Sequence, residues 1–124
     1  MEFFRFSKES GTKINKFNSN FVMSRIVKTE NPAHIGCVYL ETEGVIGYHQ
    51  AILPQLLLVV NGEAEVCGED KVKHKIKAGE AVFWIKGEYH ETTAKGDLTA
   101  IIIESESLEP VSLMKLNENI QGDF

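Results

Sequence analysis

The sequence predicts an all-β fold, a sandwich or barrel, and two observations favour it. Short runs of β-branched and aromatic residues recur about every eight to twelve residues, separated by Gly, Asn and Asp. The middle of the chain contains no stretch longer than about ten residues with the 3.6-residue apolar period of a helix. The expected strands cover residues 21–28, 34–41, 56–60, 63–67, 71–77, 81–85 and 98–104.

The clearest connection between two of these strands is the dipeptide Asn61-Gly62. Both residues tolerate the positive φ angles that a two-residue hairpin turn requires, and strand-like residues flank them on both sides. Further turns are expected at 68–70 and 77–80. Within 71–77 every second residue is Lys, so one face of this strand is charged and the other carries Val72, His74 and Ile76. We therefore expect a sheet with one solvated face and one packed face.

Composition is typical of one globular domain, taken here as residues 1–124. Of the 124 residues, 43% are apolar and 25% are charged, and a chain of this length can bury one core. The formal net charge of −5 disfavours binding to nucleic-acid phosphates. No apolar run is long enough to cross a bilayer, and the first residues lack the apolar segment of a secretion signal. We expect a cytoplasmic protein with no membrane partner, in which Cys37 and Cys67 are free thiols and the polar segment 105–124 forms a short helix or an ordered arm.

The segment 44–94 contains two groups of residues with regular spacing. In the first group the pattern is H-x-A-x3-Q-x6-G, formed by His49, Ala51, Gln55 and Gly62. In the second, Gly79 and Gly87 precede His90, and Ile85 and Ala94 occupy two further motif positions. This pattern resembles the cupin superfamily, whose first motif contains H-x-H-x3-E-x6-G and whose second is similar to G-x5-P-x-G-x2-H-x3-N. The resemblance implies a single-domain cupin-like β-barrel, that is, a double-stranded β-helix or jelly roll.

The resemblance also implies a metal site. A cupin metal is held by three histidines and a glutamate, and the matching positions here supply His49, His90 and the amide of Gln55. Because none of these groups is an anion, the affinity for a divalent ion should be reduced, and Ca²⁺ and Mg²⁺ are excluded because they need several oxygens. Zn, Ni, Fe or Cu remain candidates. For an iron site with two histidines and one carboxylate, the carboxylate would come from Glu88, which has the same strand parity as His90.

Several residues have both a functional and a structural interpretation. His49 and His90 either bind a metal or are satisfied polar residues that line a wet barrel. Tyr48, Trp84 and Tyr89 lie next to the motif residues and either line a pocket for a small organic ligand or pack between strands. Pro54 leaves open whether Ala51 and Gln55 share a face, because proline is confined to strand starts, edges and bulges.

The sequence therefore predicts a protein that binds a small polar molecule in the barrel, with a weakly held transition metal at His49 and His90. The alternative is a metal-dependent cupin enzyme, of isomerase or dioxygenase type, that acts on a small carbonyl or acid substrate. Sequence alone does not distinguish these two functions. A homodimer is expected in either case, because the strand edges of such a sheet need a partner.

Overall fold

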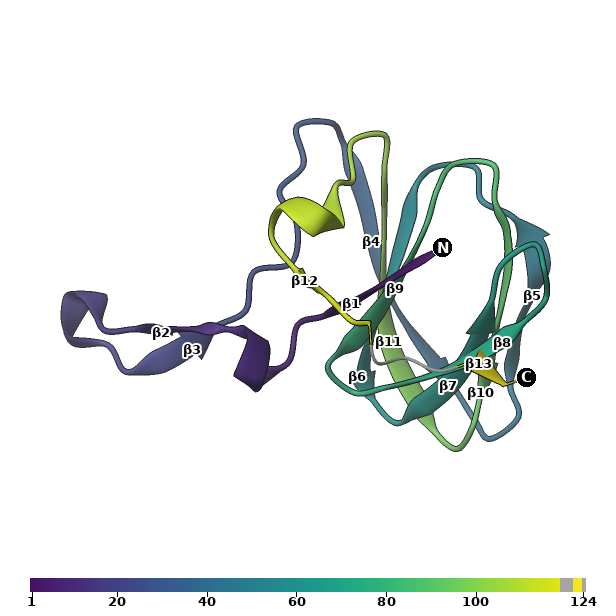
Figure 1. Cartoon of the computed structure of the whole chain (residues 1–124), viewed down its shortest axis with the longest axis horizontal. Coiled ribbons are helices and arrows are strands. Elements are labelled where there is room, and N and C mark those ends of the chain that lie inside the picture. The colour runs from purple at the N-terminus through teal and green to yellow at the C-terminus, as the bar shows by residue number, and fades with distance from the viewer. Residues whose placement is uncertain (119–121, 124) are drawn as a thin grey trace.

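The computed structural model describes residues 1–118 and 122–123 of the chain. Two antiparallel sheets face each other, and a hairpin arm projects from them (Figure 1). The six-stranded sheet has the order β12 (Lys115–Leu116), β1 (Glu2–Arg5), β9 (Glu80–Trp84), β6 (Gln55–Asn61), β11 (Leu98–Ser105) and β4 (Ala33–Leu40). The five-stranded sheet has the order β13 (Gly122–Asp123), β8 (Lys73–Lys77), β7 (Glu63–Cys67), β10 (Tyr89–Ala94) and β5 (Val45–Gln50). The prediction of an all-β barrel of the jelly-roll type is confirmed.

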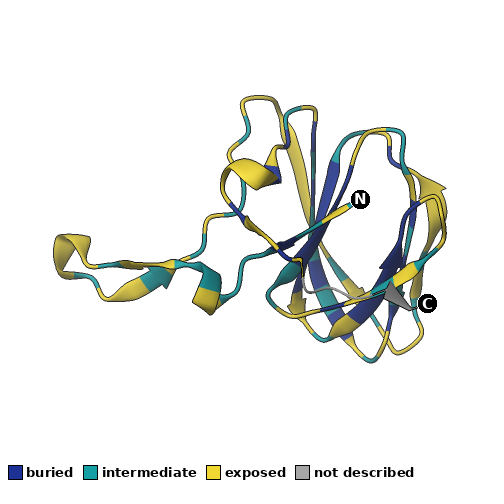
Figure 2. Cartoon of the chain, in the orientation of Figure 1, coloured by how far each residue is buried: buried dark blue, intermediate teal, exposed yellow. Residues whose placement is uncertain are grey.

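The core lies between the two sheets, because each sheet turns one apolar face inward (Figure 2). The fully or nearly fully buried members of this cluster are Leu57, Val59, Ala64, Val66, Ile76, Val82, Trp84, Ala94, Leu98 and Ala100. A second cluster covers the outer face of the six-stranded sheet, where Phe4, Leu56 and Phe83 pack against Leu108 and Met114. The six-stranded sheet is therefore packed on both faces, which explains the continuous apolar run at the start of β6.

The hairpin expected at Asn61-Gly62 is not formed, because β6 belongs to the six-stranded sheet and β7 to the five-stranded sheet, so this tight turn carries the chain from one sheet to the other. Gly62 has φ +93° between β6 and β7, and a Cβ atom there would collide with the backbone carbonyl oxygen of Asp97. Only glycine satisfies both the positive φ angle and this close approach. The alternation in β8 is confirmed, since its lysines are exposed, Ile76 is buried and His74 is half-buried.

Several strands differ from the prediction, and the short strands β1, β2 (Thr12–Ile14), β12 and β13 were not among those expected. The segment expected as a strand over 21–28 is a strand only over Phe21–Met23 (β3), which pairs with β2. β5 and β10 were not predicted, because Gly47 interrupts the first and Glu and Thr dominate the second. Both gain their stability from pairing with each other rather than from their own residue preferences.

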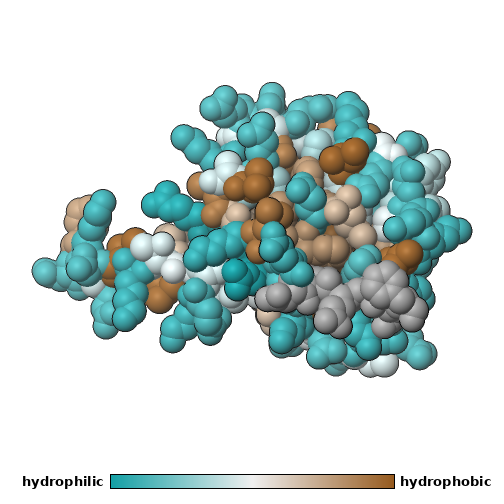
Figure 3. Space-filling view, in the orientation of Figure 1, coloured by the Kyte–Doolittle hydropathy of each residue, from teal (hydrophilic) through white to brown (hydrophobic). Residues whose placement is uncertain are grey.

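The arm consists of β2 and β3 with the short 3-10 helices η1 (Lys8–Ser10) and η2 (Lys16–Asn18). It extends away from the barrel in Figure 1, and Figure 3 shows brown hydrophobic patches on it among hydrophilic residues. Phe17 at its tip is 95% exposed. At the other end of the chain, η3 (Pro110–Ser112) lies within the segment expected to be an arm or a short helix. Residues 119–121 and 124 of that segment lie outside the described part.

Within the described residues, no helix has the length and apolar character needed to span a membrane. Both cysteines are free thiols, as expected: Cys37 is exposed on β4 and Cys67 is buried at the end of β7.

Candidate functional site

The two motif histidines lie side by side on the five-stranded sheet. His49 on β5 and His90 on β10 are direct partners in the register of the two strands. Their ring centroids are 4.4 Å apart, with an angle of 53° between the ring planes. His90 is 1% exposed, whereas His49 is exposed at the edge of the sheet. The structure thus brings together two imidazoles that are 41 positions apart in the printed sequence.

A β-bulge sets the direction of the His49 side chain. His49 pairs with His90 and Ile46 pairs with Thr92, so Gly47 and Tyr48 together lie opposite one residue of β10. Because of this extra residue, Ile46 and His49 both face the inside of the barrel although they are three positions apart. Without the bulge, strand alternation would turn one of them outward.

Hydrogen bonds to the backbone fix the tautomer of both rings. Nδ1 of His49 lies 2.6 Å from the carbonyl oxygen of Gly47, and Nδ1 of His90 lies 3.3 Å from that of Glu88. A carbonyl oxygen can only accept, so Nδ1 carries the proton in each ring and the lone pair is on Nε2. Nε2 of His90 is buried and has no hydrogen-bond partner among the described residues. Imidazoles that bind metals in proteins are commonly held in this way, with the second ring nitrogen donating to a carbonyl group.

The environment keeps His90 in its neutral form. Burial lowers the pKa of His90 below its usual value of 6.5, and the nearby His49 lowers it further. The Glu88 carbonyl and the charges of Glu88 and Glu104 act in the opposite direction but do not reverse the shift. Since metals bind the unprotonated imidazole, a low pKa makes His90 available as a ligand at neutral pH.

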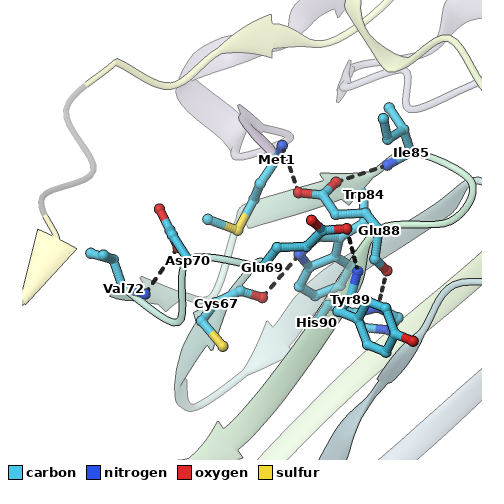
Figure 4. A network of polar contacts seen from close by, with 10 residues as sticks. All are labelled: Met1, Cys67, Glu69, Asp70, Val72, Trp84, Ile85, Glu88, Tyr89 and His90. Carbon is cyan, nitrogen blue, oxygen red and sulfur yellow. Dashed lines mark hydrogen bonds and ion pairs between the residues drawn. The ribbon is translucent and has the colours of Figure 1, made fainter.

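Trp84 supports His90 from the six-stranded sheet. Its indole ring is fully buried and stacks on the imidazole, with centroids 4.4 Å apart and an interplanar angle of 28°. The indole Nε1–H donates a hydrogen bond of 3.1 Å to the carbonyl oxygen of Cys67, so its one polar group is satisfied (Figure 4). Trp84 therefore has the structural role considered from the sequence, because it packs between the sheets, and it lies directly against His90.

Gln55 faces the histidines from the opposite sheet. It is the first residue of β6, directly after Pro54, and its register partner on β9 is Trp84. Gln55 is 6% exposed and has the same parity as the core residues Leu57 and Val59. Pro54 thus marks a strand start, and the segment between His49 and Gln55 crosses from one sheet to the other.

Glu104 is a residue of this site that the sequence reasoning missed. It is the partner of Gln55 in the pairing of β11 with β6, and it follows Ala100 and Ile102 on the inward face of β11. Its charge influences the pKa of His90, which shows that the two groups are close enough to interact. The signal in the sequence was a carboxylate at an inward position of an otherwise apolar alternating strand.

Glu88 is not the carboxylate that completes a set of metal ligands. Its Oε2 lies 3.1 Å from the amino group of Met1, and its Oε1 accepts a 3.1 Å hydrogen bond from the backbone N–H of Ile85 (Figure 4). Glu88 lies in the turn before β10 rather than in the strand, so the expected parity with His90 does not apply. Among the described residues, no group of three His, Cys, Asp or Glu side chains could hold a metal ion.

Tyr48 and Tyr89 lie on the outer face of the five-stranded sheet, away from the histidines. Their rings stack on each other with centroids 5.4 Å apart, and the Lys71 ammonium lies 4.7 Å from the centre of the Tyr48 ring. Tyr89 alternates with the inward His90, and Tyr48 belongs to the bulge. The structure therefore does not bring these two rings to the inside of the barrel, as the interpretation of pocket lining would require.

The two imidazoles are the nitrogen donors that the site offers to a transition-metal ion, and their ring centroids are 4.4 Å apart. The remaining donor on the facing strand is the Gln55 amide. Two neutral nitrogens and an amide suit a borderline ion such as Zn²⁺, Ni²⁺ or Cu²⁺ better than a hard cation.

Comparison with known proteins gives a consistent result for the fold. No protein-family model and no curated protein sequence matches the chain. Solved structures do match it, among them a cupin superfamily protein from Desulfitobacterium hafniense, with a TM-score of 0.57, 15% identity, and coverage of 64% of this chain and 72% of that one. An RmlC-like cupin from Shewanella frigidimarina has a TM-score of 0.57 and 19% identity over 64% of this chain and 70% of its own. KdgF from a Halomonas species has a TM-score of 0.57 and 26% identity over 67% of this chain and 78% of its own. With its two facing sheets and these structural likenesses, the chain has the jelly-roll fold of the cupin structures to which it is similar.

Proposed function

We propose that this protein binds a small polar molecule between its two sheets, at a site centred on His49 and His90 that also holds a transition metal weakly. The observation that carries the proposal is the state of the two Nε2 atoms. Both lone pairs are left available by the Nδ1 hydrogen bonds, and Nε2 of His90 is buried without a partner among the described residues. A buried acceptor without a partner is costly unless a ligand or metal satisfies it.

The donor and acceptor groups of the site indicate the chemistry of the molecule. Two neutral Nε2 atoms and the Glu104 carboxylate are acceptors, and the Gln55 amide contributes one acceptor and two donors. Acceptors therefore outnumber donors on the inward faces of β5, β10, β6 and β11. A molecule rich in hydroxyl or amine donors, such as a small polyol, complements this set better than an anion does.

A metal-dependent enzyme is the second candidate, and Glu104 is the observation that favours it. Metal-assisted chemistry on a carbonyl or acid substrate needs a group that accepts a proton, and Glu104 is a carboxylate near His90 that forms no salt bridge with another described residue. In that case a metal on the histidines would polarise the substrate, and Glu104 would take up the proton.

The test is titration of the metal-free protein with Cu²⁺, Ni²⁺ and Zn²⁺. Trp84 is the only tryptophan of the chain and stacks on His90, so its fluorescence reports directly on an ion at that ring. We expect saturation at one equivalent and strong quenching by Cu²⁺. His49→Gln and His90→Gln should each weaken binding by about tenfold or more, because each removes one of two nitrogen ligands.

His74→Gln is the matched control. His74 is the histidine of β8, which is separated from β10 by β7, so its removal should leave metal affinity unchanged. Thermal shifts with glycerol, erythritol and small sugars, with and without metal, then test the organic ligand. Non-saturable binding, or equal affinity in the His49, His90 and His74 variants, would contradict the metal part of the proposal. The absence of any stabilisation by these polyols would contradict the ligand class.

We also propose a homodimer formed through the arm and the outer face of β4. A two-stranded hairpin alone is marginally stable in water, yet β2 and β3 project from the barrel with Phe17 at the tip 95% exposed (Figure 1). On β4, Ile35 and Tyr39 are 68% and 77% exposed. A second copy would cover both surfaces. Sedimentation of the protein and of a Phe17→Ser, Tyr39→Ser variant tests this, since the variant should be monomeric.

The two free thiols support the proposal of a cytoplasmic location.

A further inference from the structure

A second hollow lies at the base of the arm, away from the histidine site. Its volume is about 180 Å³, and it lies where β1, the two arm strands and the segment before β12 meet. Four of its lining residues are apolar, and the other six are Arg5, Arg25, Lys115, Ser10, Thr12 and Ser24. Among the described residues, no carboxylate lines it. This composition is unusual in a chain that has 18 acidic and 13 basic side chains.

The three cations of the hollow, Arg5, Arg25 and Lys115, form no salt bridge with any described residue, although Glu80 lies opposite Arg5 on β9. Arg5 and Lys115 are direct partners in the pairing of β1 with β12. Like charges directly opposite each other on neighbouring strands repel, so an anion between them would remove an unfavourable interaction as well as add a favourable one.

Arg5 also has an unsatisfied donor. Its Nε atom is buried and has no hydrogen-bond partner among the described residues. The carboxylate of Glu80 is opposite Arg5 on β9, but its oxygens accept from the Lys77 N–H at 2.9 Å and from Nδ2 of Asn117 at 2.7 Å. Glu80 forms no hydrogen bond with Nε of Arg5, and a buried guanidinium donor requires an acceptor.

Hydroxyl groups complete the lining. The Oγ atoms of Ser10 and Ser24 are 3.4 Å apart, and Ser10 donates to the carbonyl oxygen of Ser7 at 2.8 Å, which holds the first hydroxyl in place. Because the Ser10 proton is donated to Ser7, Thr12 and Ser24 are the lining residues whose hydroxyl groups can donate to a phosphate, beside the guanidinium groups, whose planar fork fits two oxygens.

We propose that this hollow binds a phosphate group, either as inorganic phosphate or as the phosphoryl group of a small metabolite. The three positive charges can pair with the two negative charges of a phosphate dianion, and their N–H groups can donate to its several oxygens. The volume corresponds to about six water molecules at roughly 30 Å³ each, which accommodates one phosphoryl group but not a nucleic-acid strand. This site lies outside the histidine site and does not depend on the function proposed there.

Isothermal titration of the protein with inorganic phosphate, and separately with glycerol 3-phosphate, tests the proposal. We expect saturable binding of one equivalent. Arg25→Gln and Lys115→Gln should each weaken it by about tenfold or more, the effect of losing one charged hydrogen-bond donor. Both side chains are exposed, so neither change should prevent folding. Lys16→Gln is the matched control, because Lys16 is an exposed lysine of the arm that does not line the hollow.

The outcomes separate the two sources of the phosphoryl group. Tighter binding of glycerol 3-phosphate than of inorganic phosphate identifies a phosphorylated metabolite, and equal or weaker binding identifies the free ion. Non-saturable binding, or the same weakening in Lys16→Gln as in the other variants, would show only diffuse attraction and would overturn the proposal. His90→Gln should leave phosphate affinity unchanged, so failure of the histidine site and failure of this one are distinguishable.

Discussion

Acidification should destabilise the metal-free protein through His90. The side chain is 1% exposed, and burial holds its pKa below 6.5. In the unfolded chain the same imidazole titrates near its usual value. Above pH 6.5 both states are neutral, and the full stability is present. Below pH 6.5 the unfolded state takes up a proton that the folded state does not, so stability falls until the pH reaches the pKa of the folded state.

The size of this effect follows from linkage. One proton of difference between the two states changes the free energy of unfolding by at most about 1.4 kcal/mol per pH unit. With a urea m-value of about 1–3 kcal/mol per molar, the midpoint should shift by up to roughly 0.5–1.4 M per pH unit.

Urea unfolding between pH 5.5 and 7.5, followed by the fluorescence of Trp84, measures this shift. The informative quantity is the difference in slope between the protein and its His90→Gln variant, because this difference isolates the contribution of His90. The variant should show a smaller dependence on pH, whatever its absolute stability. If both proteins have the same slope, His90 is not held neutral by burial, and the interpretation of its Nε2 as an available ligand is incorrect.

Two further predictions concern the framework of the site. Gly62→Ala should destabilise more than Gly87→Ala, because both glycines have nearly the same positive φ, +93° and +88°, but only at Gly62 would the added Cβ meet the backbone oxygen of Asp97. Gly87→Ala, the control, should lower the free energy of unfolding by about 1–3 kcal/mol through backbone strain alone. Equal losses for the two variants in urea unfolding would exclude a steric contribution from the contact with Asp97. Trp84→Phe should lower the free energy of unfolding by about 1–3 kcal/mol, because the carbonyl of Cys67 then loses its donor. The same change should weaken metal binding, because the indole positions His90. Unchanged unfolding and unchanged metal affinity would show that the stacking has no such role.

The alternation was sufficient to predict the central strands of the barrel, whereas the Asn61-Gly62 signal predicted a hairpin where the chain crosses between the sheets. β7 has the bounds expected from the sequence, β11 differs by one residue at one end, and β4, β6 and β9 differ by one residue at each end. β10 was missed because Glu91, Thr92 and Thr93 have no apolar alternation, and its position depends on partners on both sides. Such pairing between distant segments is not encoded in the local pattern.

Within the site, the sequence singled out the two histidines and Gln55, but it did not place Tyr48, Glu88 and Glu104. Strand parity alone could not place Tyr48, because the bulge at Gly47 and Tyr48 shifts the register by one residue. Glu88 was misplaced for a related reason, since it lies in a turn to which parity does not apply. Glu104 was not predicted to belong to the site, although strand parity places it on the inward face of β11, because it lies outside both motifs.

The position of β1 has a consequence for how the protein is made. This strand lies inside the six-stranded sheet, where Phe4 pairs with Ala81 on one side and with Leu116 on the other. β1 therefore has no partner during synthesis until β9 has been made, and the sheet is complete only when β12 follows. A fold with such distant partners should form slowly, and the nascent chain exposes Phe3, Phe4 and Phe6 throughout this delay, which makes it prone to aggregate before it folds.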